Sequence, residues 1–440
     1  MTVGTLAYVR SLRSELPRSV YVLQAGLVLN AFGNGAANPF VVLYLHDVRG
    51  IPLGVAGLAA AANATAALAS ALIAGRFADR SGARATMIVG LGCSATAFVL
   101  YPFVHEPWQA FPVAMLGGAG GGIWLTMQSA LLATITPKHL RAPAFAQQRV
   151  VANVGLGLGG FVGGLIVTTG NSATFTTLFL FNAVTFVVYS LFLLRVHVPA
   201  RKPAARHERG GYGAVLRDGA FVRFAAVHLV YVTGTIALLN GLFPVYAHNE
   251  AAVSEHTIGA FFLLNSLLII VFQIPTTRAC EGRSRMRGFA LIGVLFAACW
   301  LLVFAGGSSP GGTVAILLLA AGITAMSFGE CIYDSIQGPL VSDLAPAQLL
   351  GRYMAVMGFA WQLGFIAGPA TGGFILGANP SALWPTMAAI CLVGAAYSLR
   401  LERRLPETVR VTPRRERATV VASTIAADGD VGAAGIPPAA

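Results

Sequence analysis

The stretch "GRFADRSGAR", residues 75–84, lies between two long apolar runs of the chain. The run before it, 52–75, and the run after it, 85–104, each have the roughly 20 residues with which a helix crosses about 30 Å of hydrocarbon. Inside a bilayer a helix satisfies its own backbone hydrogen bonds, whereas a short polar stretch with glycine favours a turn at the membrane surface. The sequence therefore predicts a hairpin of two membrane helices here.

The composition extends this prediction to the whole chain. Of its 440 residues 56% are hydrophobic and only 10% are charged, whereas a soluble domain has about 25% charged residues. Further spans are expected at the other apolar runs, roughly 18–45, 109–135, 145–169, 173–194, 219–247, 257–277, 287–305, 313–341, 353–377 and 381–400. The predicted fold class is all-α and integral to the membrane, with about twelve transmembrane helices.

A basic segment near the middle of the chain divides these spans six and six. The segment 195–219, "RVHVPARKPAARHERGGYGAVLRDG", is rich in proline, glycine and arginine, which is typical of a linker. The end of the chain is charged and then rich in alanine and glycine, a composition that cannot bury a core. The expected organisation is a cytoplasmic N-terminal segment (1–17), an N-terminal six-helix half (18–194), a basic cytoplasmic linker (195–218), a C-terminal six-helix half (219–400) and a disordered cytoplasmic tail (401–440).

The positive charges predict an orientation. The formal net charge is +12, which by itself could indicate a nucleic-acid partner. With the N-terminus inside, however, every Lys and Arg except Arg49 falls on the cytoplasmic side or at a cytoplasmic helix end. The residues that fall outside are His46, Asp47, His105, Glu106, Glu250 and Glu255. This pattern follows the positive-inside rule, so we expect a multi-pass protein of the cytoplasmic membrane with both termini in the cytoplasm and no nucleic-acid partner.

The two predicted halves repeat each other weakly. At one constant offset, Gln128 pairs with Gln337, Pro137 with Pro346 and Leu140 with Leu349. The same offset places "GLGLGGFVGG" (155–164) over "GFIAGPATGG" (364–373), and a degenerate counterpart of residues 75–84 occurs at 277–287. Parallel repeats that bind a ligand where they meet, near the middle of the bilayer, are a transporter architecture. The repeat therefore predicts two pseudo-symmetric six-helix halves.

At these motifs the chain resembles the major facilitator superfamily of transporters. "GRFADRSGAR" is similar to the signature of that superfamily between its second and third helices: a glycine, then Ala-Asp-Arg, then a glycine and a basic residue. "GFIAGPATGG" has the spacing of a glycine-proline motif associated with antiporters of the superfamily. The resemblance covers residues 18 to 400 and implies the major facilitator fold, with helices 1, 4, 7 and 10 along the pathway.

Two groups of residues are candidates for gating. The first is Gly75, Asp79, Arg80, Gly82 and Arg84, which can be read as a simple positive-inside turn. The resemblance implies instead that Asp79 docks at a helix N-terminus of the other half, where the helix dipole favours a carboxylate, and closes the cytoplasmic side. The second group can be read as helix packing through small residues or, because proline bends a helix, as a hinge: Gly364, Gly368, Pro369, Gly372 and Gly373.

Two acidic residues lie inside a predicted span. Glu330 and Asp334 are four residues apart and thus share one helix face. A carboxylate at the bilayer centre costs at least about 2.5–3.5 kcal/mol, so such residues face a cavity or the protein interior. Burial and a neighbouring carboxylate both disfavour the charged form, which makes this pair the candidate for proton coupling, with Glu330 the deeper residue. The alternatives are a purely structural pair, a role of Asp334 in binding substrate or in sharing the proton, or His228 as the proton carrier.

The pathway helices also offer candidate substrate-binding side chains. They are amides and aromatic residues: Asn34, Asn38, Trp124, Gln128, Asn240, Phe243 and Tyr246. A mostly apolar wall with a few amides suits an amphipathic, cationic organic molecule. Asn38 precedes Pro39, so its side chain could instead satisfy a broken helical turn.

The expected function is secondary active transport: proton-coupled efflux of drug-like or secondary-metabolite molecules by alternating access. A proton-coupled importer of a small solute is the alternative, followed by a membrane sensor that does not transport. The sequence has no Walker A, HExxH or metal-binding pattern, so an enzyme, a cofactor and a bound metal are not expected. The expected partners are a small-molecule substrate, protons and the lipid bilayer, and the expected state is a monomer.

Overall fold

A computed structural model of the chain describes residues 16–137, 140–196, 212–239, 241–309, 312–346 and 348–413. Within these residues twelve helices are long and apolar enough to cross a membrane. The predicted fold class, all-α with about twelve transmembrane helices, is therefore confirmed.

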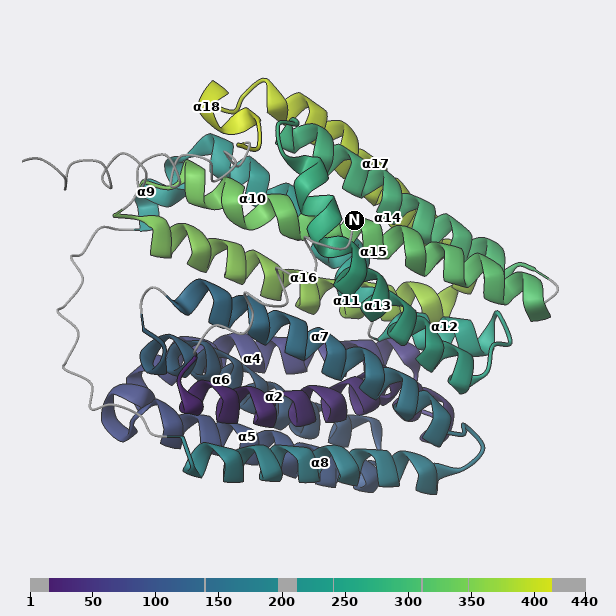
Figure 1. Cartoon of the computed structure of the whole chain (residues 1–440). Coiled ribbons are helices and arrows are strands. Elements are labelled where there is room, and N and C mark those ends of the chain that lie inside the picture. The colour runs from purple at the N-terminus through teal and green to yellow at the C-terminus, as the bar shows by residue number, and fades with distance from the viewer. Residues whose placement is uncertain are drawn as a thin grey trace, which may run out of the picture.

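The first six spans form one side of the molecule, coloured purple to blue in Figure 1. Span 1 consists of α2 (Arg18–Ala37), the 3₁₀ turn Asn38–Phe40, α3 (Val41–Leu43) and a π-helical turn (Tyr44–Val48). The others are α4 (Leu53–Ser81), α5 (Ala83–Leu100, followed by the 3₁₀ turn Tyr101–Phe103), α6 (Ala110–Ile135, preceded by the 3₁₀ turn Pro107–Gln109), α7 (Arg141–Ile166) and α8 (Ser172–Leu194).

The second six spans, green to yellow in Figure 1, follow the short helix α9 (Tyr212–Arg217). Span 7 consists of α10 (Gly219–Tyr231), a π-helical turn (Val232–Ile236) and α11 (Ala237–Leu239), and α12 (Leu242–Asn249) continues beyond Gly241. The others are α13 (Glu255–Cys280), α14 (Arg285–Gly307), α15 (Gly312–Leu344), α16 (Leu350–Ala378) and α17 (Pro380–Glu402), and the short helix α18 (Glu407–Arg410) comes last.

Polar residues fix the starts of several spans. Asp218 accepts hydrogen bonds from the backbone N–H groups of Ala220 and Phe221 at the start of α10, at 3.0 and 3.1 Å. Asn171 does the same for α8 and Asn379 for α17. Such caps satisfy N–H groups that have no partner inside the helix. They are local sequence signals, which is why the predicted boundaries lie close to the observed ones.

The turn within residues 75–84 contains fewer non-helical residues than the sequence predicted. The helix α4 continues to Ser81, so that Gly75, Asp79 and Arg80 lie within its last two turns. Only Gly82 interrupts the helices, at φ +85°, a backbone conformation that favours glycine. Gly82 therefore makes the hairpin, while the charged residues are carried on a rigid helix end.

The glycine motifs of the two halves make equivalent helix contacts. On α7, a Cβ built at Gly159 would overlap the carbonyl oxygen of Phe32, so α7 lies directly against the backbone of α2. On α16, Gly368 makes the corresponding approach to the carbonyl oxygen of Thr233 in span 7, at 2.8 Å from the built Cβ. Small residues that permit such close approach favour helix packing in a membrane. These equivalent contacts show the pseudo-symmetry of the halves.

The last glycine of each motif contacts the opposite half. Gly164 of α7 lies against Gly259 of α13, and Gly373 of α16 lies against Gly57 of α4. The helices α7 and α13 and the helices α4 and α16 therefore form the interface between the halves, and they occupy the middle of the molecule in Figure 1.

The chain beyond residue 400 differs from the predicted disordered tail as far as residue 413. Leu401, Leu405 and Val409 are buried, and Val411 pairs with Ser284 in an isolated antiparallel bridge. These three apolar residues pack on the protein although α17 ends at Glu402 and α18 begins only at Glu407, and the average composition of the tail conceals them. Residues 414–440 lie outside the described residues, as do 1–15 and 197–211 of the predicted N-terminal segment and linker.

Candidate transport site

A cavity of about 670 Å³ lies between the two halves. Its wall comes from spans 1, 2, 4 and 5 of the first half and from spans 7, 8, 10 and 11 of the second. Aromatic and aliphatic side chains make most of the wall, among them Leu156, Phe262, Trp361 and Phe365. The only charged residues that line it within the described chain are Arg149, Glu330 and Asp334.

Both predicted carboxylates line this cavity, and they have different partners. Glu330 accepts a hydrogen bond at 3.0 Å from Nδ2 of Asn265, which lies on α13. The same amide group donates to Ser327 Oγ, also at 3.0 Å. Glu330 is thus held by neutral polar groups of its own half, and no cation lies within ion-pair distance among the described residues. A carboxyl group in such a setting can exist with or without its proton.

Asp334 forms an ion pair with Arg149 of α7, so this contact joins the two halves across the cavity. Arg149 lies eight residues after the start of α7, about 12 Å along the helix axis. The sequence prediction missed Arg149 because a basic residue so close to the start of a span was counted as a cytoplasmic helix end. The position of Arg149, two turns after the start of the helix, could have indicated that it lies within the span.

The predicted asparagines of span 1 lie on the cavity. Asn34 and Asn38 both line it, and Nδ2 of Asn38 donates to Oδ1 of Asn34 at 3.1 Å. Nδ2 of Asn34 donates in turn to the carbonyl oxygen of Asn30 at 2.9 Å. The cavity also contains amides that the sequence did not single out, namely Asn63, Asn153 and Asn265. Amides from both halves therefore face the space between them.

Three other predicted substrate-binding residues lie away from the cavity. Trp124 is buried against Phe186 of α8, with ring centroids 6.4 Å apart, and its neighbour Leu125 lines the cavity instead. Gln128 is buried within the first half. Phe243 packs on Phe261 within the second half, with ring centroids 6.1 Å apart. In a helix that is apolar on all sides, the sequence does not reveal which face meets the cavity. Asn240 lies outside the described residues.

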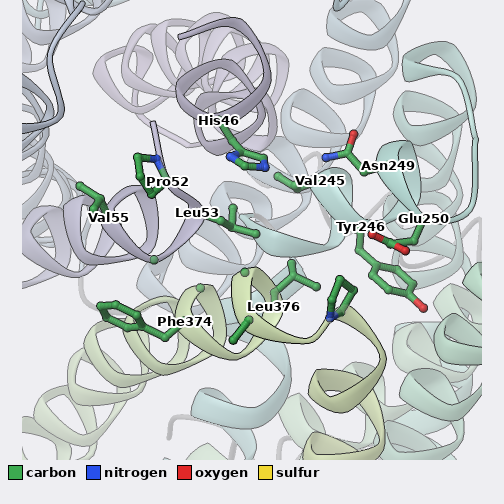
Figure 2. A pocket seen from close by; sticks show the side chains of 15 residues that line it. His46, Pro52, Leu53, Val55, Val245, Tyr246, Asn249, Glu250, Phe374 and Leu376 are labelled. Carbon is green, nitrogen blue, oxygen red and sulfur yellow. The ribbon is translucent and has the colours of Figure 1, made fainter. Parts of the chain in front are cut away.

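Tyr246 lies at a different pocket, of about 490 Å³, at the end of the molecule where α4 begins and α16 ends. Figure 2 shows Tyr246 and Glu250 on one side of this pocket and His46, Pro52 and Leu53 on the other. The Tyr246 hydroxyl donates to the carbonyl oxygen of Phe304 at 3.5 Å, and its ring packs on Trp384. Tyr246 is therefore not part of the central cavity.

His228 lies behind the cavity wall. It is 2% exposed, and its Nδ1 is hydrogen-bonded to the hydroxyl of Tyr333, which itself lines the cavity. The other ring nitrogen, Nε2, is buried without a hydrogen-bond partner among the described residues. His228 thus contacts the cavity wall through Tyr333 and through Trp361, whose ring centroid lies 6.1 Å from that of His228.

The halves are in close contact at the end shown in Figure 2, called here the closed end. Nδ2 of Asn249 donates to Asp47 Oδ1 at 3.0 Å, and the backbone N–H of Thr169 donates to Glu255 Oε1 at 2.6 Å. The glycine contacts between α4 and α16 and between α7 and α13 lie at the same end. These contacts join the two halves beyond the cavity at this end.

The same helices separate at the opposite end, called here the open end. Gly57 and Gly75 are 18 residues apart, five full turns of α4, and so lie on one face of that helix. A Cβ built at Gly57 would overlap the carbonyl oxygen of Pro369, whereas one built at Gly75 would have nothing within 4 Å. On α16, Gly351 lies five turns before Pro369 and also has nothing within 4 Å. Among the described residues, α4 and α16 therefore diverge toward this end.

The predicted latch is not formed in this structure. Asp79 is exposed at the open end, with no partner in the part of the chain that the structure describes, and Arg80 and Gly82 are exposed as well. Arg84 donates to the carbonyl oxygen of Val196, at the start of the linker that follows its own half, at 3.2 Å. Asp79 lies near the end of α4, where α4 and α16 are already far apart. Its side chain therefore does not reach the other half. Gly364, Gly368, Pro369, Gly372 and Gly373 are buried at helix contacts, as expected for packing residues.

Comparisons with known proteins agree with this architecture. The profile of the Major Facilitator Superfamily matches residues 24–325 and 232–430. The uncharacterized MFS-type transporter YhjO of Bacillus subtilis (strain 168) is 26% identical over 402 residues, which is 88% of this chain and 94% of that protein. The multidrug resistance protein MdtH of Klebsiella pneumoniae (strain 342) is 23% identical, covering 84% of this chain and 90% of its own length.

Solved structures share the fold at low sequence identity. The nucleoside transporter NupG superimposes with a TM-score of 0.71 at 12% identity, covering 87% of this chain and 98% of its own. A peptide transporter named POT gives a TM-score of 0.70 at 18% identity, covering 90% of this chain and 96% of its own. At such identity the likeness extends to the fold alone.

Proposed function

Because the chain belongs to the Major Facilitator Superfamily and is a multi-pass membrane transporter rather than an enzyme, we propose that it exports amphipathic, cationic organic molecules in exchange for protons. The observation that carries this proposal is the set of charges in the central cavity. Arg149, Glu330 and Asp334 together carry one net negative charge when both acids are ionised.

This charge can be neutralised in two ways. A proton on Glu330 or a monovalent cation beside it brings the cavity to neutrality, and the two together would leave an excess positive charge in a site of low dielectric. Proton and substrate therefore compete for one carboxylate. Such competition is the minimum requirement for exchange, because each ligand releases the other.

Arg149 makes the two acids unequal. Its ion pair favours the ionised form of Asp334, while Glu330 has only neutral hydrogen-bond partners among the described residues. We therefore assign the transported proton to Glu330 and the contact between halves to Asp334. The apolar wall and the asparagines of the cavity would hold the organic part of the substrate.

The orientation of the chain belongs to the proposal. Following the positive-inside prediction, the open end, with residues 75–84 and the linker, faces the cytoplasm, and both termini lie there. The structure would then be the state that loads substrate from the cytoplasm. Residues 18–194 and 219–400 are the two moving halves, and 195–218 connects them.

The direction of transport has separate support. Relatives of this chain are named multidrug resistance proteins, a name that accords with export. The glycine-proline motif at 364–373 agrees with antiport. A proton-coupled importer would use the same acids, so direction requires a measurement.

Flux in proteoliposomes tests the proposal. Purified protein is reconstituted, a pH gradient of either sign is imposed, and uptake of a panel of fluorescent organic cations is followed. Antiport requires that cations accumulate in the more acidic compartment. Accumulation in the more alkaline compartment would identify a symporter, and no proton-dependent flux with any cation would reject the proposed substrate class.

A further inference from the structure

A groove of about 580 Å³ lies on the second half, at the open end and away from the transport cavity. The helices α13 and α14 both pack along α15, and the groove lies between them with Phe328, Ile332 and Ile336 of α15 as its floor. The turn that joins α13 to α14 forms its outer end. Since the adjoining helices span the membrane, this turn lies at the membrane surface.

The groove changes character along its length. At the turn it is lined by Arg283, Ser284 and Arg287, and no acidic residue lines it within the described chain. Deeper in the membrane it is lined by apolar side chains, including Leu291, which is 48% exposed on the membrane-facing surface. Its shape thus combines two cations at the membrane surface with an apolar channel that runs toward the bilayer interior.

The two arginines differ in how firmly they are engaged. The Nε of Arg287 lies 3.6 Å from Glu402 Oε2, but the Arg287 side chain is 77% exposed, and an exposed pair of this kind is weak. Arg283 has no acidic partner within ion-pair distance among the described residues. The nearby Arg285 is different, because it is buried and paired with Asp343 at 2.5 Å. Arg283 and Arg287 therefore remain available to an external anion.

We propose that this groove binds an anionic phospholipid, with the phosphate at Arg283 and Arg287 and one acyl chain against Leu291, Phe328 and Ile332. A guanidinium group matches a phosphate with parallel hydrogen bonds, and basic pockets between membrane helices suit acidic headgroups. A free phosphate could use the arginines but would leave the apolar part of the groove empty. A zwitterionic lipid could fill the apolar part but would gain less from two cations.

Native mass spectrometry and thermal unfolding of the purified full-length protein test this proposal. Phosphatidylglycerol, phosphatidylcholine and inorganic phosphate are each titrated into detergent-solubilised protein. We expect phosphatidylglycerol to raise the melting temperature and to remain bound in the gas phase, whereas the other two do so far less. Equal stabilisation by phosphatidylcholine, or by inorganic phosphate alone, would overturn the proposal.

Two variants test the charged part and the apolar part of the groove separately. Arg283→Gln with Arg287→Gln should weaken phosphatidylglycerol binding roughly thirtyfold, the factor expected for two surface cations. Ala279→Trp keeps both arginines and fills the groove from an exposed wall position, and it should also displace the lipid. Unchanged binding by either variant would contradict the proposed site. If the double variant fails to fold, Ala279→Trp still decides.

A matched control tests whether charge alone is enough. Arg403 and Arg404 line a pocket at the same end, where Leu399 is the one apolar side chain among the four described residues that line it. Arg403→Gln with Arg404→Gln removes the same charge and should leave phosphatidylglycerol binding unchanged. An equal loss in this control would show general attraction to a basic surface rather than a built lipid site.

Discussion

Glu330 and Asp334 show how neighbours give different roles to two like residues. They share one face of α15, yet Glu330 is bound by an amide and Asp334 by a guanidinium group of the opposite half. An isolated intramembrane carboxylate is costly when charged, so Glu330 gains more from a proton than Asp334 does. Under the proposed mechanism, proton exchange at Glu330 would therefore leave the contact between the halves in place.

Glu330→Gln should abolish transport driven by a pH gradient. Glutamine keeps the shape and the hydrogen bond from Asn265 but cannot take up or release a proton, so substrate binding and exchange of substrate across the membrane should persist. Flux in proteoliposomes with and without a pH gradient, alongside a binding assay, measures both. Glu250→Gln at the closed end is the control and should transport normally. If Glu330→Gln accumulates substrate as the wild type does, the role of Glu330 is structural, and His228 becomes the next candidate for the proton carrier.

Arg149 and Asp334 should behave as one functional unit. Arg149→Gln leaves Asp334 without its cation, and Asp334→Asn leaves Arg149 without its anion, so each should reduce the transport rate. The variant with both changes should be no slower than the slower single variant, because the first change already removes the shared contact. Transport rates of the four proteins give the coupling. Additive losses would show that the two residues act independently.

At the scale of helices, α4 and α16 meet at one end and separate at the other. At Gly57 and Gly373 backbone atoms of the two helices meet, and beside them the ring of Phe374 lies against Gly54. Close approach at these glycines therefore holds the two helices together at the closed end.

Gly57→Ala should open the closed end. The added methyl group would overlap the carbonyl oxygen of Pro369, and overpacking of this kind costs about 1–3 kcal/mol. A cysteine introduced at Asn38 in the cavity should then react with an impermeant thiol reagent from the closed end at least about fivefold faster. Gly75→Ala, on the same helix face but free of contacts, is the control. An unchanged labelling rate in Gly57→Ala would refute the role of this contact in closure.

Asp79→Asn should separate stability from transport. In this structure Asp79 is exposed near the C-terminal end of α4, where the helix dipole disfavours a negative charge. Loss of the charge should therefore leave the melting temperature of this state unchanged or slightly raised, while transport falls if the carboxylate docks in the opposite state. Membrane abundance, melting temperature and flux are compared with those of the wild type. Normal flux would leave the residues around Asp79 as a topology signal only.

At the scale of the whole molecule, the orientation in the membrane can be tested directly. Cysteines placed at Arg206 in the linker and at Glu250 at the closed end should be labelled from opposite sides of the membrane. Cys93 and Cys280 are partly exposed, and the remaining cysteines are buried, so a parent without Cys93 and Cys280 removes the background. Labelling of position 206 from outside intact cells would reverse the proposed orientation.

The sequence predicted those features that depend on local signals. The spans follow from the length of apolar runs, and helix starts such as the one at Asp218 follow from capping residues. Glu330 and Asp334 could be found because charge is rare within a span. The placement of Trp124 was wrong, since an all-apolar helix gives no sign of which face meets a cavity. Arg149 was missed because its role depends on an ion pair with Asp334, which lies on a helix of the other half.

The chain after α17 packs on the protein as far as residue 413, so a group attached just after that residue would start from a defined position. The backbone of Thr412 is hydrogen-bonded to Gly282 and Arg283, at 2.8 and 3.0 Å, and Leu405 and Val409 are buried before it. A fluorophore attached just after residue 413 would therefore sense the turn between α13 and α14 rather than bulk solvent. Cleavage between Glu402 and Leu405 would release that turn from its neighbour, so the same reporter would also detect proteolytic trimming of the protein during purification.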